Sequence, residues 1–104
     1  MHKQIDNFIS CIEEERFYDA HEALEELWFP RRFEEDAEVK LLKGFINAAV
    51  SFELKKRGRE KQSQKVWANY LKYRQSLFKV NSPYKNRYNT LSRFVEAKKR
   101  ELSL

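Results

Sequence analysis

The sequence predicts an all-α fold, a single helical bundle of about five helices that occupies residues 1–104. Helix breakers are rare, with only two glycines and two prolines in the chain. Apolar residues make up 41% of the chain, enough to bury a core, and they recur at helical spacing. A length of 104 residues supports one core and leaves no room for a second domain.

The first two helices are predicted from apolar spacing and from terminal signals. An amphipathic stripe over about residues 3–14 consists of Ile5, Phe8, Ile9 and Ile12. Asp19, followed three residues later by Glu22, has the pattern of a capping box and predicts that the second helix starts there. Pro30 excludes the α conformation for Phe29, so that this helix should end near Trp28.

A helix over about residues 36–57 is predicted to be central, because apolar residues cover more than half of its circumference. Gly44 inside it costs about 1 kcal/mol relative to alanine, which indicates a packing reason for a small residue. Gly58 is suited to the position just after the helix. Two further helices are expected over about residues 60–79 and 85–101.

Cysteine usage and charge suggest the compartment and the partners. A single cysteine, Cys11, cannot form an internal disulfide, and no signal peptide is visible, so we expect a cytoplasmic protein that does not enter membranes. Residues 1–38 carry twelve acidic and four basic side chains, whereas residues 39–104 carry seventeen basic and four acidic ones. We expect these halves to attract one another, within one chain or across a homodimer.

His21, Glu25 and Trp28 form the one constellation that could carry chemistry. Their i, i+4 and i+7 spacing places all three on one side of the second helix. His21 falls within the apolar stripe, where a buried imidazole needs a hydrogen-bond partner that Glu25 can supply.

Three interpretations of this constellation stay open. The pair His21/Glu25 is a buried structural pair in a helical protein–protein interaction or dimerisation module, or it belongs to a ligand or acid–base site between helices. The third is a divalent-metal site, with a hydrolase-like activity as a lesser alternative. Divalent metals usually take three or four protein ligands, so Glu53 or a second subunit would have to add to His21 and Glu25.

As an enzyme, the protein would use Glu25 to orient His21 as a general base. Trp28 would wall the pocket, and Tyr18 or Asn47 could hydrogen-bond a substrate. One observation separates the alternatives. A ligand site needs His21 at an open pocket, whereas a packing role needs a sealed ring with partners for both nitrogens.

Basic residues of the second half alternate with aromatic ones, which could mimic a nucleic-acid surface; the aromatic residues are Trp67, Tyr70, Tyr73, Tyr84 and Tyr88. At helical spacing such aromatics are more often core. We do not expect direct nucleic-acid binding, because no recognised motif is present.

Three segments resemble the domain-of-unknown-function 309 family. The segment 17–28, FYDAHEALEELW, is similar to its signature of a small residue, His and Glu followed by Glu and Trp. Residues 41–50, LLKGFINAAV, resemble its second block, and Arg57-Gly58-Arg59 the turn that follows. The resemblance covers about residues 8–80.

The resemblance implies a small all-α bundle and a candidate site at His21, Glu25 and Trp28, but no particular reaction. Two positions depart from the family pattern. Lys43 stands where Gln commonly precedes the glycine, and Glu53 lies near the place of a frequent His. A carboxylate at Glu53 would replace a neutral imidazole and change the chemistry of the site.

Overall fold

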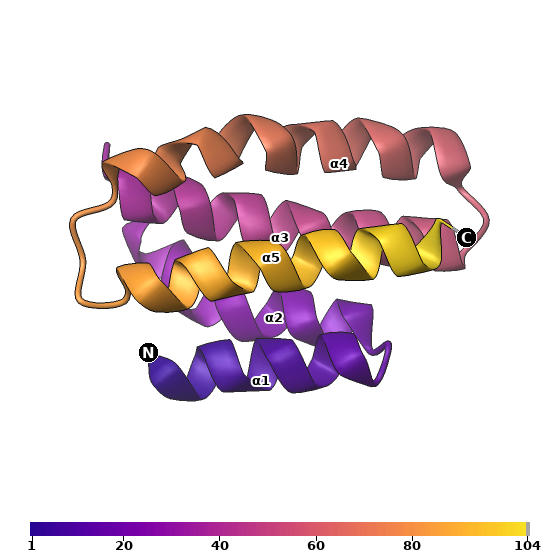
Figure 1. Cartoon of the computed structure of the whole chain (residues 1–104), viewed down its shortest axis with the longest axis horizontal. Helices are drawn as coiled ribbons and strands as arrows, with labels where there is room; N and C mark the ends of the chain where they lie inside the picture. Colours follow the sequence, from indigo (N-terminus) through magenta and orange to yellow (C-terminus); the bar gives the residue numbers. More distant parts are fainter. Residues whose placement is uncertain (104) are drawn as a thin grey trace.

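A computed structural model of the chain describes residues 1–103, which form five α-helices and two short 3-10 helices (Figure 1). In chain order these are α1 (His2–Glu13), α2 (Phe17–Trp28), η1 (Phe29–Arg31), α3 (Ala37–Lys56), α4 (Glu60–Arg74), η2 (Gln75–Lys79) and α5 (Lys85–Leu102). The predicted all-α bundle is confirmed. None of the described helices combines the length and the apolar character that a membrane span requires.

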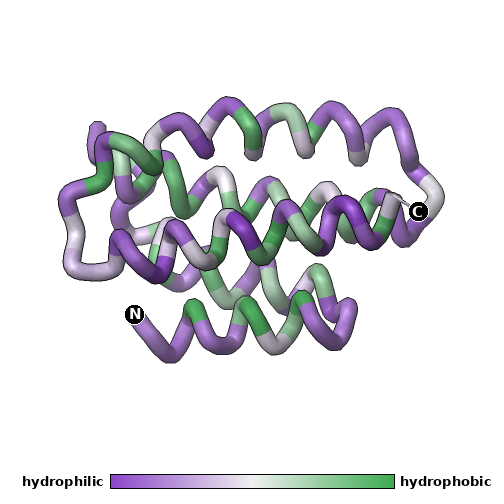
Figure 2. The backbone as a smooth tube through the Cα atoms, viewed as in Figure 1, coloured by the Kyte–Doolittle hydropathy of each residue, from purple (hydrophilic) through white to green (hydrophobic). Residues whose placement is uncertain are grey.

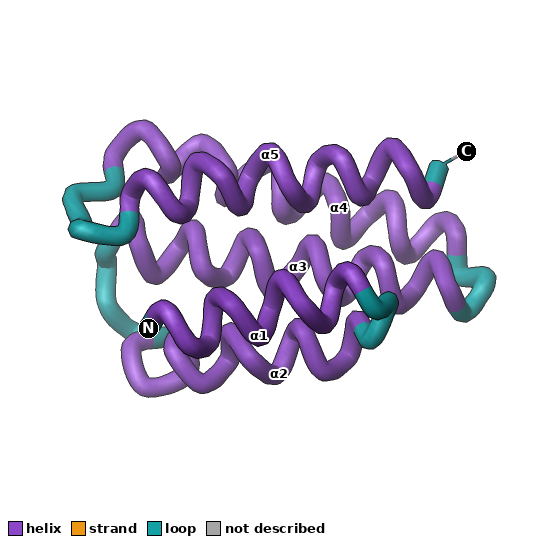
Figure 3. The backbone as a smooth tube through the Cα atoms, turned by 60° about the horizontal axis from the view of Figure 1, so that its bottom comes forward, coloured by secondary structure: helices purple, strands orange, loops and turns teal. Residues whose placement is uncertain are grey.

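Helix α3 is the centre of the bundle, as predicted. It packs against α2, α4 and α5, while α1 packs along α2. Figure 2 shows hydrophobic residues along much of α3, whereas α4 and α5 carry more hydrophilic ones. Figure 3 shows α1 beside α2, with only a short turn between them. The two halves of the charge distribution meet within the chain, since Arg87 pairs with Asp6 at 2.6 Å and Lys98 with Glu15 at 3.2 Å.

The start of α2 differs from the prediction. The helix begins at Phe17, Arg16 is its N-cap residue, and no side chain caps it. The Asp19 carboxylate instead accepts a hydrogen bond from Arg16 at 3.0 Å. Phe17 is buried, and its packing extends the helix three residues beyond the start that Asp19 as N-cap would give. His21 is therefore the fifth residue of the helix. It lies beyond the first turn, and the effect of the helix dipole on a charge is largest within that turn.

The end of α2 corrects a second expectation. The helix ends at Trp28 as predicted, but Phe29 keeps right-handed helical angles (φ −58°, ψ −45°) although Pro30 follows it. A following proline disfavours this conformation and does not forbid it. The chain accommodates the ring by continuing into η1, in which Pro30 occupies one of the first two positions.

The termini of α3 follow the sequence signals. The Asp36 carboxylate accepts a hydrogen bond from the Glu38 backbone N–H at 2.7 Å, and Gly58 after the helix has a positive φ of 78°. The helix predicted over residues 60–79 is divided, because the α-helix stops at Arg74 and its last turns become η2. Helix α5 starts at the predicted residue.

Gly44 lies on the side of α3 that faces α4. A Cβ atom there would be 2.9 Å from Cβ of Tyr73 and 3.7 Å from the carbonyl oxygen of Tyr70. The packing reason expected for this glycine is therefore the close approach of α4.

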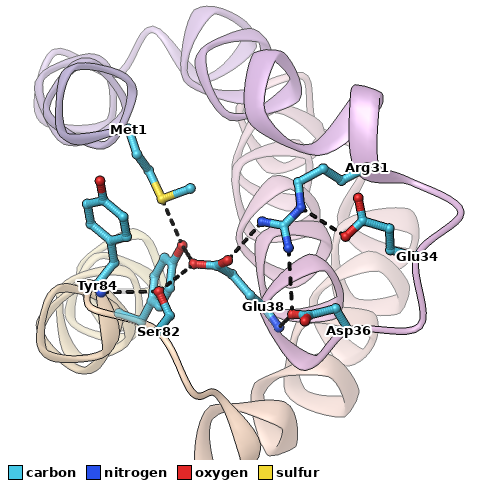
Figure 4. Close-up of polar contacts among 8 residues, drawn as sticks. Met1, Arg31, Glu34, Asp36, Glu38, Ser82 and Tyr84 are labelled. Atoms are coloured by element: carbon cyan, nitrogen blue, oxygen red, sulfur yellow. Dashed lines mark hydrogen bonds and ion pairs between the residues drawn. The ribbon is translucent and has the colours of Figure 1, made fainter.

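A buried carboxylate joins four parts of the chain at one end of the bundle (Figure 4). Glu38 accepts hydrogen bonds from Arg31 at 2.8 Å, from Ser82 at 2.8 Å and from the Tyr88 hydroxyl at 2.7 Å. Burial raises the pKa of Glu38, but the hydrogen bonds from Arg31, Tyr88 and Ser82 outweigh burial and bring the pKa below its ordinary value. This cluster holds the entry to α3 against α5.

Candidate functional site

A cleft of about 270 Å³ lies between α2 and α3. Its walls are apolar apart from a few polar side chains, a composition typical of small-molecule sites. The lining residues come from one face of α2, from the last turns of α3 and from the residue that follows it: Phe17, Tyr18, His21, Val50, Glu53, Leu54 and Arg57. Three of the residues that the sequence singled out, Tyr18, His21 and Glu53, therefore come together here.

His21 makes one side-chain hydrogen bond within residues 1–103. Its Nε2 lies 3.0 Å from Oε1 of Glu25, one turn further along α2. A carboxylate only accepts, so the imidazole donates from Nε2, and in the neutral ring Nδ1 then carries a lone pair. The His21 side chain is 20% exposed, and Nδ1 is buried without a hydrogen-bond partner in the described chain.

Glu53, on α3, presents a second unpaired atom. Its Oε2 is buried and has no hydrogen-bond partner among residues 1–103, while Oε1 lies 3.6 Å from Nε of Arg57. Only three buried side-chain polar atoms in that range lack a partner, and the third, Oε1 of Gln4, is outside this cleft. Buried polar groups are nearly always hydrogen-bonded, so two unpaired ones in the lining of one cleft need an explanation.

Tyr18 completes the rim of the cleft. Its side chain is exposed, and its ring centroid lies 5.5 Å from that of His21, with the planes tilted by 43°. An aromatic ring at this place offers a face to a ligand that enters from solvent.

Trp28 and Asn47 lie outside the cleft lining. Trp28 is half-buried near the end of α2, with Nζ of Lys43 at 4.2 Å from the centroid of its ring system. Asn47 donates from Nδ2 to the Lys43 carbonyl oxygen at 2.8 Å, within α3. The structure therefore joins His21 and Glu25 directly, and places Trp28 apart from them.

A family model for a domain of unknown function, DUF309, matches residues 5–66. This span contains every residue that lines the cleft. The chain belongs to the DUF309 family. The comparison with curated proteins and the comparison with solved structures each found no match.

The DUF309 match ends within α4, so that η2 and α5 lie beyond it. The described part of the chain contains no group of three or more His, Cys, Asp or Glu side chains placed to hold a metal ion. His21 and Glu25 thus gain no third ligand from Glu53 in this arrangement.

Four lining residues were not predicted as part of the site: Phe17, Val50, Leu54 and Arg57. A signal for Phe17 and Arg57 exists in the spacing. Phe17 lies one turn before His21, and Arg57 one turn after Glu53, so each shares a helix face with a predicted residue.

Proposed function

We propose that this DUF309 protein binds a small polar molecule in the cleft between α2 and α3, with His21 as a hydrogen-bond and proton acceptor. The observation that carries the proposal is that two residues lining one open cleft, His21 and Glu53, each carry a buried polar atom, Nδ1 and Oε2, without a hydrogen-bond partner in the described chain. A bound molecule that donates hydrogen bonds would satisfy both atoms and remove their desolvation cost.

The alternative of a purely structural histidine has less support. A structural pair would tie α2 to a neighbouring element and would leave both ring nitrogens hydrogen-bonded. His21 and Glu25 belong to the same helix, and the second ring nitrogen is unpaired within residues 1–103. The pair thus fixes the orientation of the imidazole without joining two helices.

The same arrangement supports an acid–base role. Glu25 would hold the Nε2 proton and stabilise the imidazolium that forms when Nδ1 accepts a proton from a bound molecule. Tyr18 at the rim could hydrogen-bond that molecule.

Probe binding measured by NMR tests the proposed function. We expect butylammonium chloride or n-butanol, which donate hydrogen bonds, to shift backbone signals of Tyr18, His21 and Leu54 and the ring signals of the first two at millimolar concentration. Sodium butyrate, which brings no donor, is the comparison. Glu26 lies outside the cleft, so Glu26→Gln should leave these shifts unchanged, whereas His21→Ala should abolish or reduce them several-fold. If neither butylammonium nor n-butanol shifts the cleft signals, the proposed function is wrong.

A second copy of the chain is a further candidate partner, supported by a different observation. Phe29, Phe33 and Phe78 are 54%, 84% and 80% exposed, on η1, the loop after it and η2, which lie at the same end of the bundle (Figure 1). Exposed aromatic residues are typical of interfaces. Nitrogen-15 relaxation should then show tumbling about twice as slow as for a monomer of this mass, and Phe33→Ser should restore fast tumbling; concentration-independent monomer tumbling would exclude the homodimer.

A further inference from the structure

We propose that the cleft between α2 and α3 takes an alkylammonium group, the protonated form of a primary amine on an aliphatic chain. This inference rests on the proposed function, because it names the ligand class of the same site. Both unpaired atoms in the cleft residues are hydrogen-bond acceptors. In the neutral imidazole Nδ1 of His21 accepts, and Oε2 of the Glu53 carboxylate accepts as well. Their ligand must therefore bring donors.

An ammonium group matches these atoms better than other small polar groups. It brings three N–H donors and a positive charge, whereas a hydroxyl brings one donor and a carboxylate brings none. The Glu53 carboxylate lines the cleft, and the Glu25 carboxylate pairs with His21. The nearby cations already have acceptors, since Arg57 lies beside Glu53 and Lys56, 5.9 Å from the centre of the Phe17 ring, donates to the Glu15 carbonyl oxygen. Charge-assisted hydrogen bonds to a carboxylate are the stronger kind.

The walls of the cleft suit the rest of such a ligand. Val50 and Leu54 supply aliphatic surface from α3, and the exposed Tyr18 ring supplies an aromatic face at the rim. An aliphatic chain can pack along the first two, and a cation is attracted to the face of the third. Both unpaired atoms are shielded from solvent, but the terminal torsions of Glu53 and His21 are broad. Small turns about these torsions would bring a carboxylate oxygen and Nδ1 to the cleft.

The charge of Arg57 affects the binding of cations and anions to the cleft in opposite directions. Its Nε lies 3.6 Å from Oε1 of Glu53, and its side chain is 64% exposed. The carboxylate thus already attracts one cation of the chain itself, from the solvent side. Neutralising Arg57 should increase the affinity of the cleft for a cation and decrease its affinity for an anion, because like charges repel and opposite charges attract.

The test compares the same three four-carbon probes at about pH 8, where a histidine ring is ordinarily neutral. We expect butylammonium to bind at least about tenfold more tightly than butyrate or n-butanol, as judged from NMR titration of the cleft signals. Glu53→Gln should reduce butylammonium affinity about tenfold, since the amide keeps the shape and loses the charge. Arg57→Gln should raise butylammonium affinity about threefold and lower that of butyrate.

The controls separate this inference from the proposed function. Arg59→Gln removes a charge just beyond the cleft lining and should change neither affinity by more than about twofold. Arg57 is exposed, so its variant tests the site without a loss of core packing. If n-butanol binds best, or if Arg57→Gln weakens butylammonium binding, the inference is wrong while the proposed function stands. If butyrate, which brings no hydrogen-bond donor, binds best, both are wrong. If no probe reaches the cleft, both are wrong.

Discussion

Replacing Glu38 by alanine is expected to lower the free energy of unfolding by about 3 kcal/mol. The carboxylate is the shared acceptor for Arg31, Ser82 and Tyr88, and its side chain is 11% exposed. The alanine variant leaves the Tyr88 hydroxyl buried beside the weak acceptor Sδ of Met1, and removes the shortest carboxylate contact of Arg31. Urea unfolding followed by circular dichroism measures the loss.

Glu34→Ala is the matched control, because Glu34 pairs with the same arginine at 3.2 Å but is 52% exposed, and its loss should cost less than about 0.5 kcal/mol. The pKa of Glu38 is lowered in the folded protein, so the ionised carboxylate stabilises the fold at neutral pH. This stabilisation is present above the unfolded pKa and is lost as the pH falls through the folded one. The difference between wild type and Glu38→Ala should therefore shrink below about pH 4. Equal effects of the two variants at pH 7 would contradict this account of the cluster.

Gly44→Val should destabilise the protein by about 3 kcal/mol, and Gly44→Ala by about 1–2 kcal/mol. Helix propensity alone predicts the opposite sign for alanine, a gain of about 1 kcal/mol. The steric term should win, because the new Cβ would lie 2.9 Å from Cβ of Tyr73, an atom bonded directly to the backbone of α4. Helices α3 and α4 would have to move apart.

Ala68→Val provides the comparison for Gly44→Val, since Ala68 is exposed on α4 and valine there should cost only its helix propensity, about 0.5 kcal/mol. Thermal unfolding followed by circular dichroism ranks the three variants. A higher melting temperature for Gly44→Ala than for wild type would show that α3 and α4 have room between them.

The helices were predictable because their signals are local. Apolar spacing, Asp36 and Gly58 were sufficient to place α3 within one residue at each end. The start of α2 was not predictable from its capping pattern, because burial of Phe17 against the rest of the core decides it. No pattern in the sequence around Arg74 indicates the change from α4 to η2. The Glu38 cluster joins residues 44 and 50 positions apart, which no local pattern indicates.

The candidate site was partly predictable for the same reason. The i, i+4 spacing correctly joined His21 to Glu25, and the departure from the family pattern drew attention to Glu53. A helical wheel gives direction but not position along the axis. Trp28 shares a side with His21, yet seven residues at 1.5 Å each place it about 10 Å further along α2. The cleft arises only where α2 meets the end of α3, which is a matter of helix packing.

The protonation of the His21 ring tests the central claim most directly. Long-range proton–nitrogen NMR on the imidazole at about pH 8 should show the proton on Nε2, where Glu25 holds it, and an unprotonated Nδ1 whose signal shifts when butylammonium is added. Glu25→Ala should allow both tautomers. A ring that carries its proton on Nδ1, with nitrogen signals that no probe alters, would contradict the account.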